Sequence, residues 1–425
     1  MVEHPDFMKA RQNPAVQYAA PKPVQWRDRI PFLLGAILAI GLAAFESQTA
    51  GDAEIFLSAS SDLFHGVNPY AQRYHTWYHY YYDLLFLWII HPLTWLPARL
   101  AKFIWILVLE LAMFRTWHLV EQRMPPLSST RSVWKERGIL LAVSINLWVV
   151  NFHLQQITPL LLWALLEATH SRSKPWKSLF VGLGMASKVM PIAALPLWFL
   201  RKDWSKMTMA LTGCLLALFL PAMWLGVSEN SELMQSRWEL LNPTNQEHTI
   251  DVDEESFHSV TTLIPTLTYA EARGTNTREW RRHIVDWPLP VVRHLTRAVQ
   301  LALILLVLAF LTSRPWTSPV DAPYEWAALF LIIPLVFPHQ QIYSFLLAFP
   351  ALAWMIRTLW FTTNTASPRW IRVVFVLSAL MLNLHFYVGA WRPYLNHYKV
   401  LTWGGLLLAC CLWASKPKVQ TLPST

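Results

Sequence analysis

Long apolar runs joined by short polar loops constrain this chain more than any other feature of its sequence. About a dozen such runs lie between residues 31 and 414, several of them close to the roughly 20 residues that a helix needs to cross a bilayer. Only 14% of the residues are charged, whereas a soluble domain carries about 25%. The sequence therefore predicts an all-α, polytopic transmembrane helical bundle of about 11–13 membrane segments.

Polar stretches divide the predicted bundle into parts. The first 30 residues are polar and basic, and the longest polar stretch begins after residue 226. A connection of that length in a compact membrane protein is expected to fold over one face of the bundle. We therefore predict a cytoplasmic N-terminal segment at 1–30, a transmembrane module at 31–226 that includes an outer loop at 46–79, an outer-face loop at 227–293, C-terminal transmembrane segments at 294–414 and a cytoplasmic tail at 415–425.

Lysine and arginine residues set the predicted orientation. Loop 46–79 contains one basic residue, Arg73, whereas loop 120–137 contains four. Because cytoplasmic loops of membrane proteins carry the excess of Lys and Arg, loop 46–79 is placed on the outer face. Two segments must then turn back within the membrane: 81–97 enters from the outer face without crossing, and 178–200 folds back at its middle.

The net charge of +9 does not indicate a nucleic-acid partner, because the basic residues lie mostly in these short loops. Membrane lipids are the expected surroundings. The three cysteines all lie in apolar runs, with neither a disulfide framework nor zinc spacing. His75 and His79 have the spacing of a helical metal pair, but no second pair matches them, so no metal is predicted.

Loop 46–79 contains the first candidate for chemistry. Asp52 follows the first apolar run by a few residues, and a carboxylate at a membrane surface can act as general base on a sugar or lipid hydroxyl. The alternative is an ordinary interfacial acid that solvates the loop. Aromatic residues are dense from Tyr74 to Tyr82, which suits packing against sugar rings but also suits an interfacial aromatic belt.

Other polar residues interrupt later apolar runs. Lys188 lies inside an apolar stretch just before Pro191, where a compact cation can hold a phosphate or pair with an acid. His339 follows Pro338 and can donate to a phosphate, relay a proton or simply form a polar turn. The amides at Asn151–Gln156 suit sugar hydroxyls or a polar connector.

In their order along residues 31–355, these residues resemble the pattern of glycosyltransferase family 87, a group of the multi-spanning glycosyltransferase C superfold. Three positions depart from that pattern. Gln155 stands where the family has Gly before Gln, Pro191 is displaced from the usual position directly after Lys, and Glu254-Glu255-Ser256 replaces an expected Asn-Gln-Ser. The matching stretches are Gly51-Asp52, Gly66–Tyr70, Tyr78–Leu96, Gln155-Gln156, Lys188–Pro191, Glu255–Phe257 and His339–Gln341.

The resemblance implies a glycosyltransferase C bundle with an outer-face active-site cavity. It further implies an inverting hexosyltransferase that moves a sugar, with mannose favoured, from a polyprenyl-phosphate donor to a lipid or glycan acceptor. The location would be the outer, periplasmic face of a bacterial inner membrane, and neither cofactor nor metal would be needed. By the same resemblance the general base is Asp52, the groups for the donor phosphate are Lys188 and His339, and the acceptor or sugar-binding residues are Tyr70, His79, Gln155, Gln156, Ser256 and Gln340.

Two other classes of protein fit an intramembrane lysine and several histidines. A membrane transporter or flippase for lipid-linked glycans would use them as a substrate or proton path. A glycan ligase would act on the outer face. The polar stretches crowd toward one predicted face rather than both halves of the membrane, which favours surface chemistry over transport.

Overall fold

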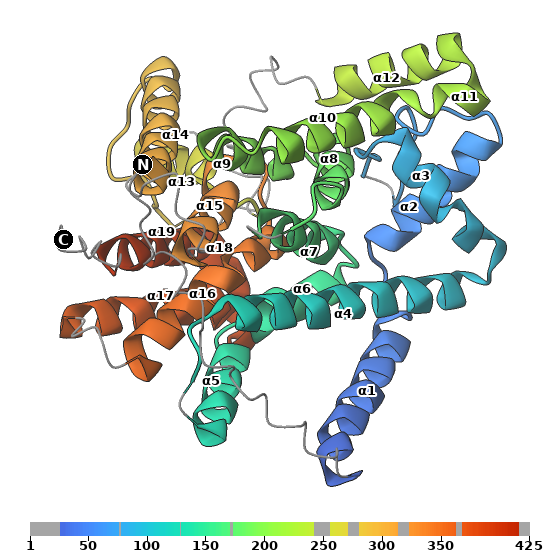
Figure 1. The fold of residues 1–425 in the computed structure, drawn as a ribbon. Coiled ribbons are helices and arrows are strands. Elements are labelled where there is room, and N and C mark those ends of the chain that lie inside the picture. Colours follow the sequence, from blue (N-terminus) through green and yellow to red (C-terminus); the bar gives the residue numbers. More distant parts are fainter. Residues whose placement is uncertain are drawn as a thin grey trace, which may run out of the picture. The chain divides into compact units, whose positions relative to one another are not determined.

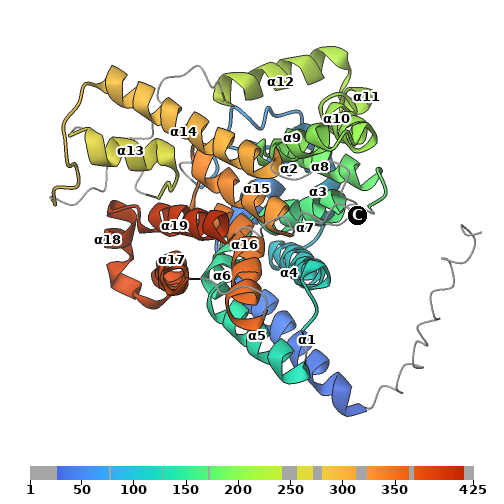
Figure 2. The ribbon, with the colours of Figure 1, turned by 60° about the vertical axis from the view of Figure 1, so that its left-hand side comes forward.

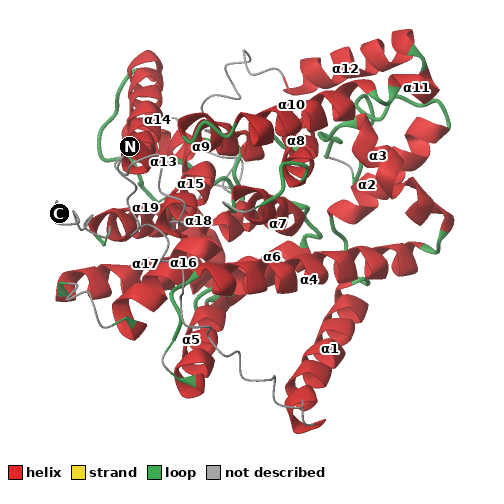
Figure 3. Ribbon diagram, in the orientation of Figure 1, coloured by secondary structure: helices red, strands yellow, loops and turns green. Residues whose placement is uncertain are grey.

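The structure is a computed structural model that describes residues 26–75, 78–127, 129–170, 173–241, 256–270, 280–312, 323–362 and 368–415. Helices dominate these residues, which contain one isolated β-bridge, Tyr74 to Tyr78, and no strand (Figure 3). The chain separates into a unit at Met1–Leu42 and a unit at Ala43–Thr425. Helix α1 (Trp26–Glu46) supplies the described part of the first unit and ends in the second.

The larger unit contains the remaining helices (Figure 1). Its first half consists of α2 (Asp52–Phe64), α3 (Leu84–Ile90), η2 (His91–Trp95), α4 (Ala98–Arg123), α5 (Thr130–Ala142), α6 (Ile145–His153), α7 (Thr158–Thr169), α8 (Lys177–Ser187), η3 (Met190–Ala193), α9 (Ala194–Leu200), α10 (Trp204–Phe219), α11 (Ala222–Leu225) and α12 (Val227–Leu241). Its second half consists of α13 (Val260–Thr268), α14 (Leu289–Thr312), α15 (Pro323–Val336), η5 (Ile342–Ala348), α16 (Phe349–Ile356), η6 (Arg357–Phe361), α17 (Arg369–Tyr387), η7 (Gly389–Trp391), α18 (Arg392–His397) and α19 (Val400–Ala414).

The helices have the lengths and surfaces of membrane segments. Within the described residues, five helical stretches are long and apolar enough to cross a membrane, and six shorter apolar helices accompany them. Large apolar side chains such as Leu111, Leu215 and Leu305 are exposed on the long ones, as a lipid-facing surface requires. The predicted all-α polytopic bundle is therefore confirmed. The five long stretches are Ala98–Arg123, Trp204–Leu225, Leu289–Thr312, Ile342–Phe361 and Arg369–Tyr387.

Two stretches of the sequence contain more than one helix. Residues 138–150, a largely apolar run in the sequence, do not form one helix, because α5 ends at Ala142 and α6 begins at Ile145. The Ser144 hydroxyl donates to the Leu140 carbonyl at 2.7 Å, a local bond that competes with helix continuation. In the described part of 227–293, the predicted outer-face loop, α12 and α13 are helical and α14 begins at Leu289. Helix α13 begins with a capping box formed by Ser259 and Thr262.

A helix disruption lies in each of the two segments, 81–97 and 178–200, that were predicted to turn back within the membrane. Helix α3 gives way to η2 at His91-Pro92, and α8 ends at Ser187, after which Lys188 is extended and Pro191 lies in η3. Proline lacks the N–H that a continuous helix needs, which explains why each run is interrupted there. The stretch Leu84–Trp95 is too short to cross a bilayer core of about 30 Å as a helix.

Close backbone contacts hold neighbouring helices together. Helices α8 and α10 pack side by side (Figure 1), and an added Cβ at Gly182 would lie 1.9 Å from the Ala210 carbonyl oxygen. Helices α17 and α19 also lie side by side (Figure 2), and the Ser378 hydroxyl donates to the Gly404 carbonyl at 2.7 Å. Small residues and polar bonds of this kind are what join helices in lipid.

Replacing Gly182 with alanine tests this packing. Because the added methyl would meet a backbone oxygen, α8 and α10 must separate, and we expect Gly182→Ala to destabilise the protein by about 1–3 kcal/mol. Gly138→Ala in α5 is the matched control, since nothing lies within 4 Å of its added Cβ. Thermal unfolding in detergent compares them, and equal midpoints for the two variants would contradict the close α8–α10 contact.

Candidate active site

Asp52 is the first residue of α2, and two contacts hold it there. Its backbone N–H donates to the Leu154 carbonyl at 3.0 Å, which joins the start of α2 to the connector between α6 and α7. Gly51 lies against the Gln155 side chain so closely that a Cβ at Gly51 would be 2.7 Å from Gln155 Cδ. The Asp52 carboxylate therefore lies at the positive end of a helix dipole, at a fixed distance from this connector.

The same connector contacts the Asp52 side chain. The Gln156 side-chain amide donates to Asp52 Oδ2, and Gln156 itself is buried. Burial raises the pKa of the Asp52 carboxyl from 3.8 to about 6. The Lys188 ammonium, the Gln156 hydrogen bond and, more weakly, the His75 ring oppose this rise in pKa. Asp52 is thus a carboxyl that changes protonation state close to neutral pH, as a general base requires.

Lys188 lies in the break between α8 and η3, and its charge interacts with that of Asp52. Its Nζ atom is buried and has no hydrogen-bond partner among the described residues. It lies 4.3 Å from the centroid of the Tyr343 ring, in the position of a cation–π contact. Among the described residues no carboxylate is hydrogen-bonded to this ammonium, so it is available to an anion from outside the protein.

Tyr343 belongs to a third interrupted run. It lies in η5, directly after the polar stretch His339–Gln341. The Asn151 side chain donates to the Tyr343 carbonyl at 2.9 Å, which ties this break to α6. The candidate site therefore combines residues from three helix interruptions. The first supplies Asp52 together with the connector between α6 and α7, the second supplies Lys188, and the third supplies Tyr343.

A second layer of polar residues supports the Lys188 break. The Ser187 hydroxyl donates to Asp83, whose carboxylate also accepts from the Phe86 N–H at 3.0 Å and so caps α3. Arg237 of α12 donates to the Ala186 carbonyl at 2.5 Å and to the Tyr81 carbonyl at 3.1 Å. Neither charged residue was predicted from the sequence. Asp83 had a local signal, an acid at the start of an apolar run, whereas Arg237 had none.

Three of the predicted sugar-binding residues make structural contacts. Gln155 has a positive φ of 56°, and its amide nitrogen donates to the Glu46 carbonyl at 3.1 Å. The buried Tyr70 donates its hydroxyl to the Tyr82 carbonyl at 2.9 Å. His79 is half-buried, with its ring centroid 6.4 Å from that of Tyr81. Of the predicted amides, Gln156 is the one that bonds to Asp52.

A separate group contains the remaining predicted residues, His339, Gln340 and Ser256. The first two lie a few residues before Tyr343 in the sequence. The Gln340 carbonyl accepts from the His258 N–H at 2.5 Å, and the His339 ring meets the Phe257 ring edge-on at 5.1 Å. Ser256 lies in the turn that precedes Phe257. This group joins the polar stretch at His339–Gln341 to the start of α13. The acidic stretch Asp251–Glu255 lies outside the described residues.

Other acids are less suited to the role of base. Glu54, two residues after Asp52 in α2, pairs with Lys102 and with His75 Nε2, the latter at 2.9 Å. No group of three His, Cys, Asp or Glu side chains in the described part of the chain is arranged to hold a metal ion.

The sequence of this chain matches a known protein family over the region that contains much of this site. The sequence model described as Glycosyltransferase family 87 matches residues 80–338, which is more than half of the 425 residues. That range includes Gln156 and Lys188, while Asp52 precedes it and Tyr343 follows it. No curated protein matches the chain significantly.

The raised pKa of Asp52 predicts how stability changes with pH. A carboxyl whose pKa rises from 3.8 to about 6 on folding favours the folded state while protonated and loses that contribution as pH rises through about 6. We therefore expect Asp52→Asn to unfold at a higher temperature than the wild type above pH 6, with a difference that shrinks toward pH 4. Thermal unfolding across this pH range measures it, with Glu239→Gln on exposed α12 as the control. A difference independent of pH would contradict the assignment.

Proposed function

Because the chain belongs to glycosyltransferase family 87, we propose that it transfers a hexose, with mannose favoured, from a polyprenyl-phosphate donor to a lipid or glycan acceptor. Its multi-pass helices make it a membrane glycosyltransferase. We propose that the reaction takes place on the outer, periplasmic face of a bacterial inner membrane, because loop 46–79, which contains Asp52, has one basic residue whereas loop 120–137 has four. One observation carries the proposal: a half-buried carboxyl whose pKa is raised to about 6 interacts electrostatically with Lys188, whose buried ammonium has no hydrogen-bond partner among the described residues.

The proposed reaction is a single displacement. Asp52 accepts the proton of the acceptor hydroxyl, and the acceptor oxygen attacks the anomeric carbon of the sugar. The bond between that carbon and the phosphate oxygen breaks with inversion, and the polyprenyl phosphate leaves with the electron pair. Lys188 stabilises the negative charge that develops on the leaving phosphate. A phosphate is already a good leaving group, so no general acid is needed.

In this proposal the other residues orient the two charged groups or contact the substrates. Gln156 orients the Asp52 carboxylate through its amide, and Gln155 holds the connector by its bonds to the end of α1. Tyr343 covers Lys188 with its ring. His339 and Gln340, just before Tyr343, and Ser256 are proposed to contact the donor or acceptor, as are Tyr70 and His79.

A transfer assay tests the proposed base. Protein in nanodiscs would receive radiolabelled polyprenyl-phosphate mannose, glucose or arabinose with a membrane lipid extract as acceptor. We expect transfer in the wild type and a loss of about 10²–10⁴-fold in Asp52→Asn. Below the pKa of about 6 the wild-type kcat/KM should fall about tenfold per pH unit, because the base is then protonated.

Asp62→Asn is the matched control, since Asp62 lies in the same helix and bonds to the Tyr74 hydroxyl instead. It should keep most of the wild-type rate. Full activity in a folded Asp52→Asn would move the base elsewhere, with Glu54 and His79 tested next. No transfer from any donor would refute the proposed reaction.

Substitutions that remove or keep the positive charge of Lys188 test its role in binding the donor phosphate. We expect Lys188→Met, which keeps the length of the side chain, to bind polyprenyl phosphate more weakly and to lower kcat, because the phosphate loses its point charge. Lys188→Arg should restore part of the binding. Binding of the sugar-free polyprenyl phosphate and steady-state kinetics measure the two effects. Unchanged affinity in Lys188→Met would remove Lys188 from the donor site.

A further inference from the structure

A groove of about 570 Å³ runs between α3, α7 and α8. Its walls are apolar, with Phe86 from α3, Leu160 and Ala164 from α7, and Phe180 and Leu183 from α8. This volume falls within the roughly 300–1,000 Å³ typical of small-ligand sites. The walls offer almost no hydrogen-bonding groups, so they suit a hydrocarbon and not a sugar.

The polar groups of the groove lie at its two ends. One end is formed by Asp83 and Ser187, which are hydrogen-bonded to each other and adjoin Lys188. The other end is formed by Glu167 and Lys177, at the far ends of α7 and α8. Ten residues of α8 separate Ser187 from Lys177, which corresponds to about 15 Å. That length is about half of a bilayer core of about 30 Å.

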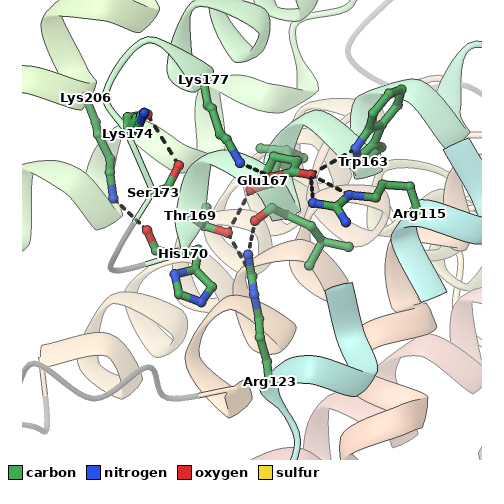
Figure 4. A network of polar contacts seen from close by, with 12 residues as sticks. Arg115, Arg123, Trp163, Glu167, Thr169, His170, Ser173, Lys174, Lys177 and Lys206 are labelled. Carbon is green, nitrogen blue, oxygen red and sulfur yellow. Dashed lines mark hydrogen bonds and ion pairs between the residues drawn. The ribbon is translucent and has the colours of Figure 1, made fainter. Parts of the chain in front are cut away.

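The far end is closed by a compact ionic cluster (Figure 4). Glu167 accepts hydrogen bonds from Arg115 Nε at 2.7 Å, from Lys177, and from Trp163 at 3.4 Å. Arg115 Nη2 also lies 2.6 Å from the same carboxylate. These side chains come from α4, α7 and α8, so the cluster ties three helices together. A hydrocarbon chain gains nothing by displacing bonded charges, so it must end or leave the groove there.

Resting on the function proposed above, we propose that this groove holds the first stretch of the donor's isoprenoid chain and that the Arg115–Glu167–Lys177 cluster is its floor. The chain is joined to the phosphate, and the groove begins beside Lys188, where that phosphate would be held. The floor then limits how much of the chain the protein contacts. The affinity for the donor therefore increases with chain length up to about 15 Å, and the rest of a longer chain lies in the bilayer.

Prenyl phosphates without sugar test this inference separately from catalysis. A graded series from geranyl phosphate to undecaprenyl phosphate would compete with a fluorescent prenyl phosphate for binding in nanodiscs. Ala164→Trp and Leu183→Trp would fill the groove from α7 and from α8. Ala302→Trp, on an exposed position of α14, is the control for size. Comparing variants at each chain length cancels the partitioning of the probe into lipid.

We expect the affinity ratio of wild type to Ala164→Trp to be about one for the shortest chain and to rise to about tenfold or more for chains that reach Ala164, then to stay constant. Leu183 lies four residues, or about 6 Å, from Ser187, so Leu183→Trp should lower the affinity already for shorter chains, and Ala302→Trp should give a ratio of about one throughout. A ratio of one at all lengths in both groove variants, with folding intact, would overturn the inference. So would equal competition by an ordinary phospholipid, which would make the groove a site for bulk lipid.

The two proposals fail in different ways. If the transfer assay finds no reaction while the binding ratio depends on chain length, the groove stands as a prenyl-phosphate site and the proposed transfer is wrong. If transfer occurs and the ratio stays at one, the reaction stands and the groove is not the chain site. Asp52→Asn should show the same dependence of binding on chain length as the wild type, because the base makes no contact with the chain.

Discussion

The opposed charges of Asp52 and Lys188 are the constraint on which the rest of the site depends. Burial penalises the charged form of each group, so the two are maintained only if the surrounding backbone fixes them near one another. That backbone consists of three interrupted helices, and each interruption frees polar groups that lipid cannot satisfy. The protein satisfies them internally: the Asp52 N–H bonds to Leu154, and the Tyr343 carbonyl accepts from Asn151. The breaks that place the charges are thus also the points that join the helices.

Along the axis of α7 and α8, the proposed reaction site is separated from the apolar surface that suits a hydrocarbon chain. At one end of the pair lies the proposed site for transfer, and at the other lies the bonded cluster around Glu167. Between them the walls are apolar. The close contact of α8 with α10, at Gly182, gives the groove a rigid back wall, because backbones in direct contact leave no freedom to shift. A donor with a charged head and a hydrocarbon tail matches this order of polar and apolar surfaces.

The membrane class, the positions of most helices and the break at Lys188 were predictable from the sequence, because each depends on local chemistry. Apolar runs of helical length must be helices in lipid, and a proline such as Pro191 disrupts a helix wherever it stands. The break within residues 138–150, which the sequence pattern did not indicate, also has a local cause. The run at 138–150 reads as continuous because Ser144 is a small residue that a membrane helix tolerates, yet its hydroxyl bonds to Leu140 and the helix ends.

From its residues alone the chain is recognisable as a helical membrane protein with an acid after its first span and a lysine inside an apolar run. Which amide contacts that acid depends on the packed structure, since Gln155 and Gln156 are neighbours and the positive φ of Gln155 turns its side chain toward Glu46 instead. The packed structure also determines that Tyr343 covers Lys188 and that Arg237 supports the break before it. The physical reason is range: helix formation and its interruption follow from neighbouring residues, whereas these contacts join residues far apart in the chain whose pairing depends on how the helices pack.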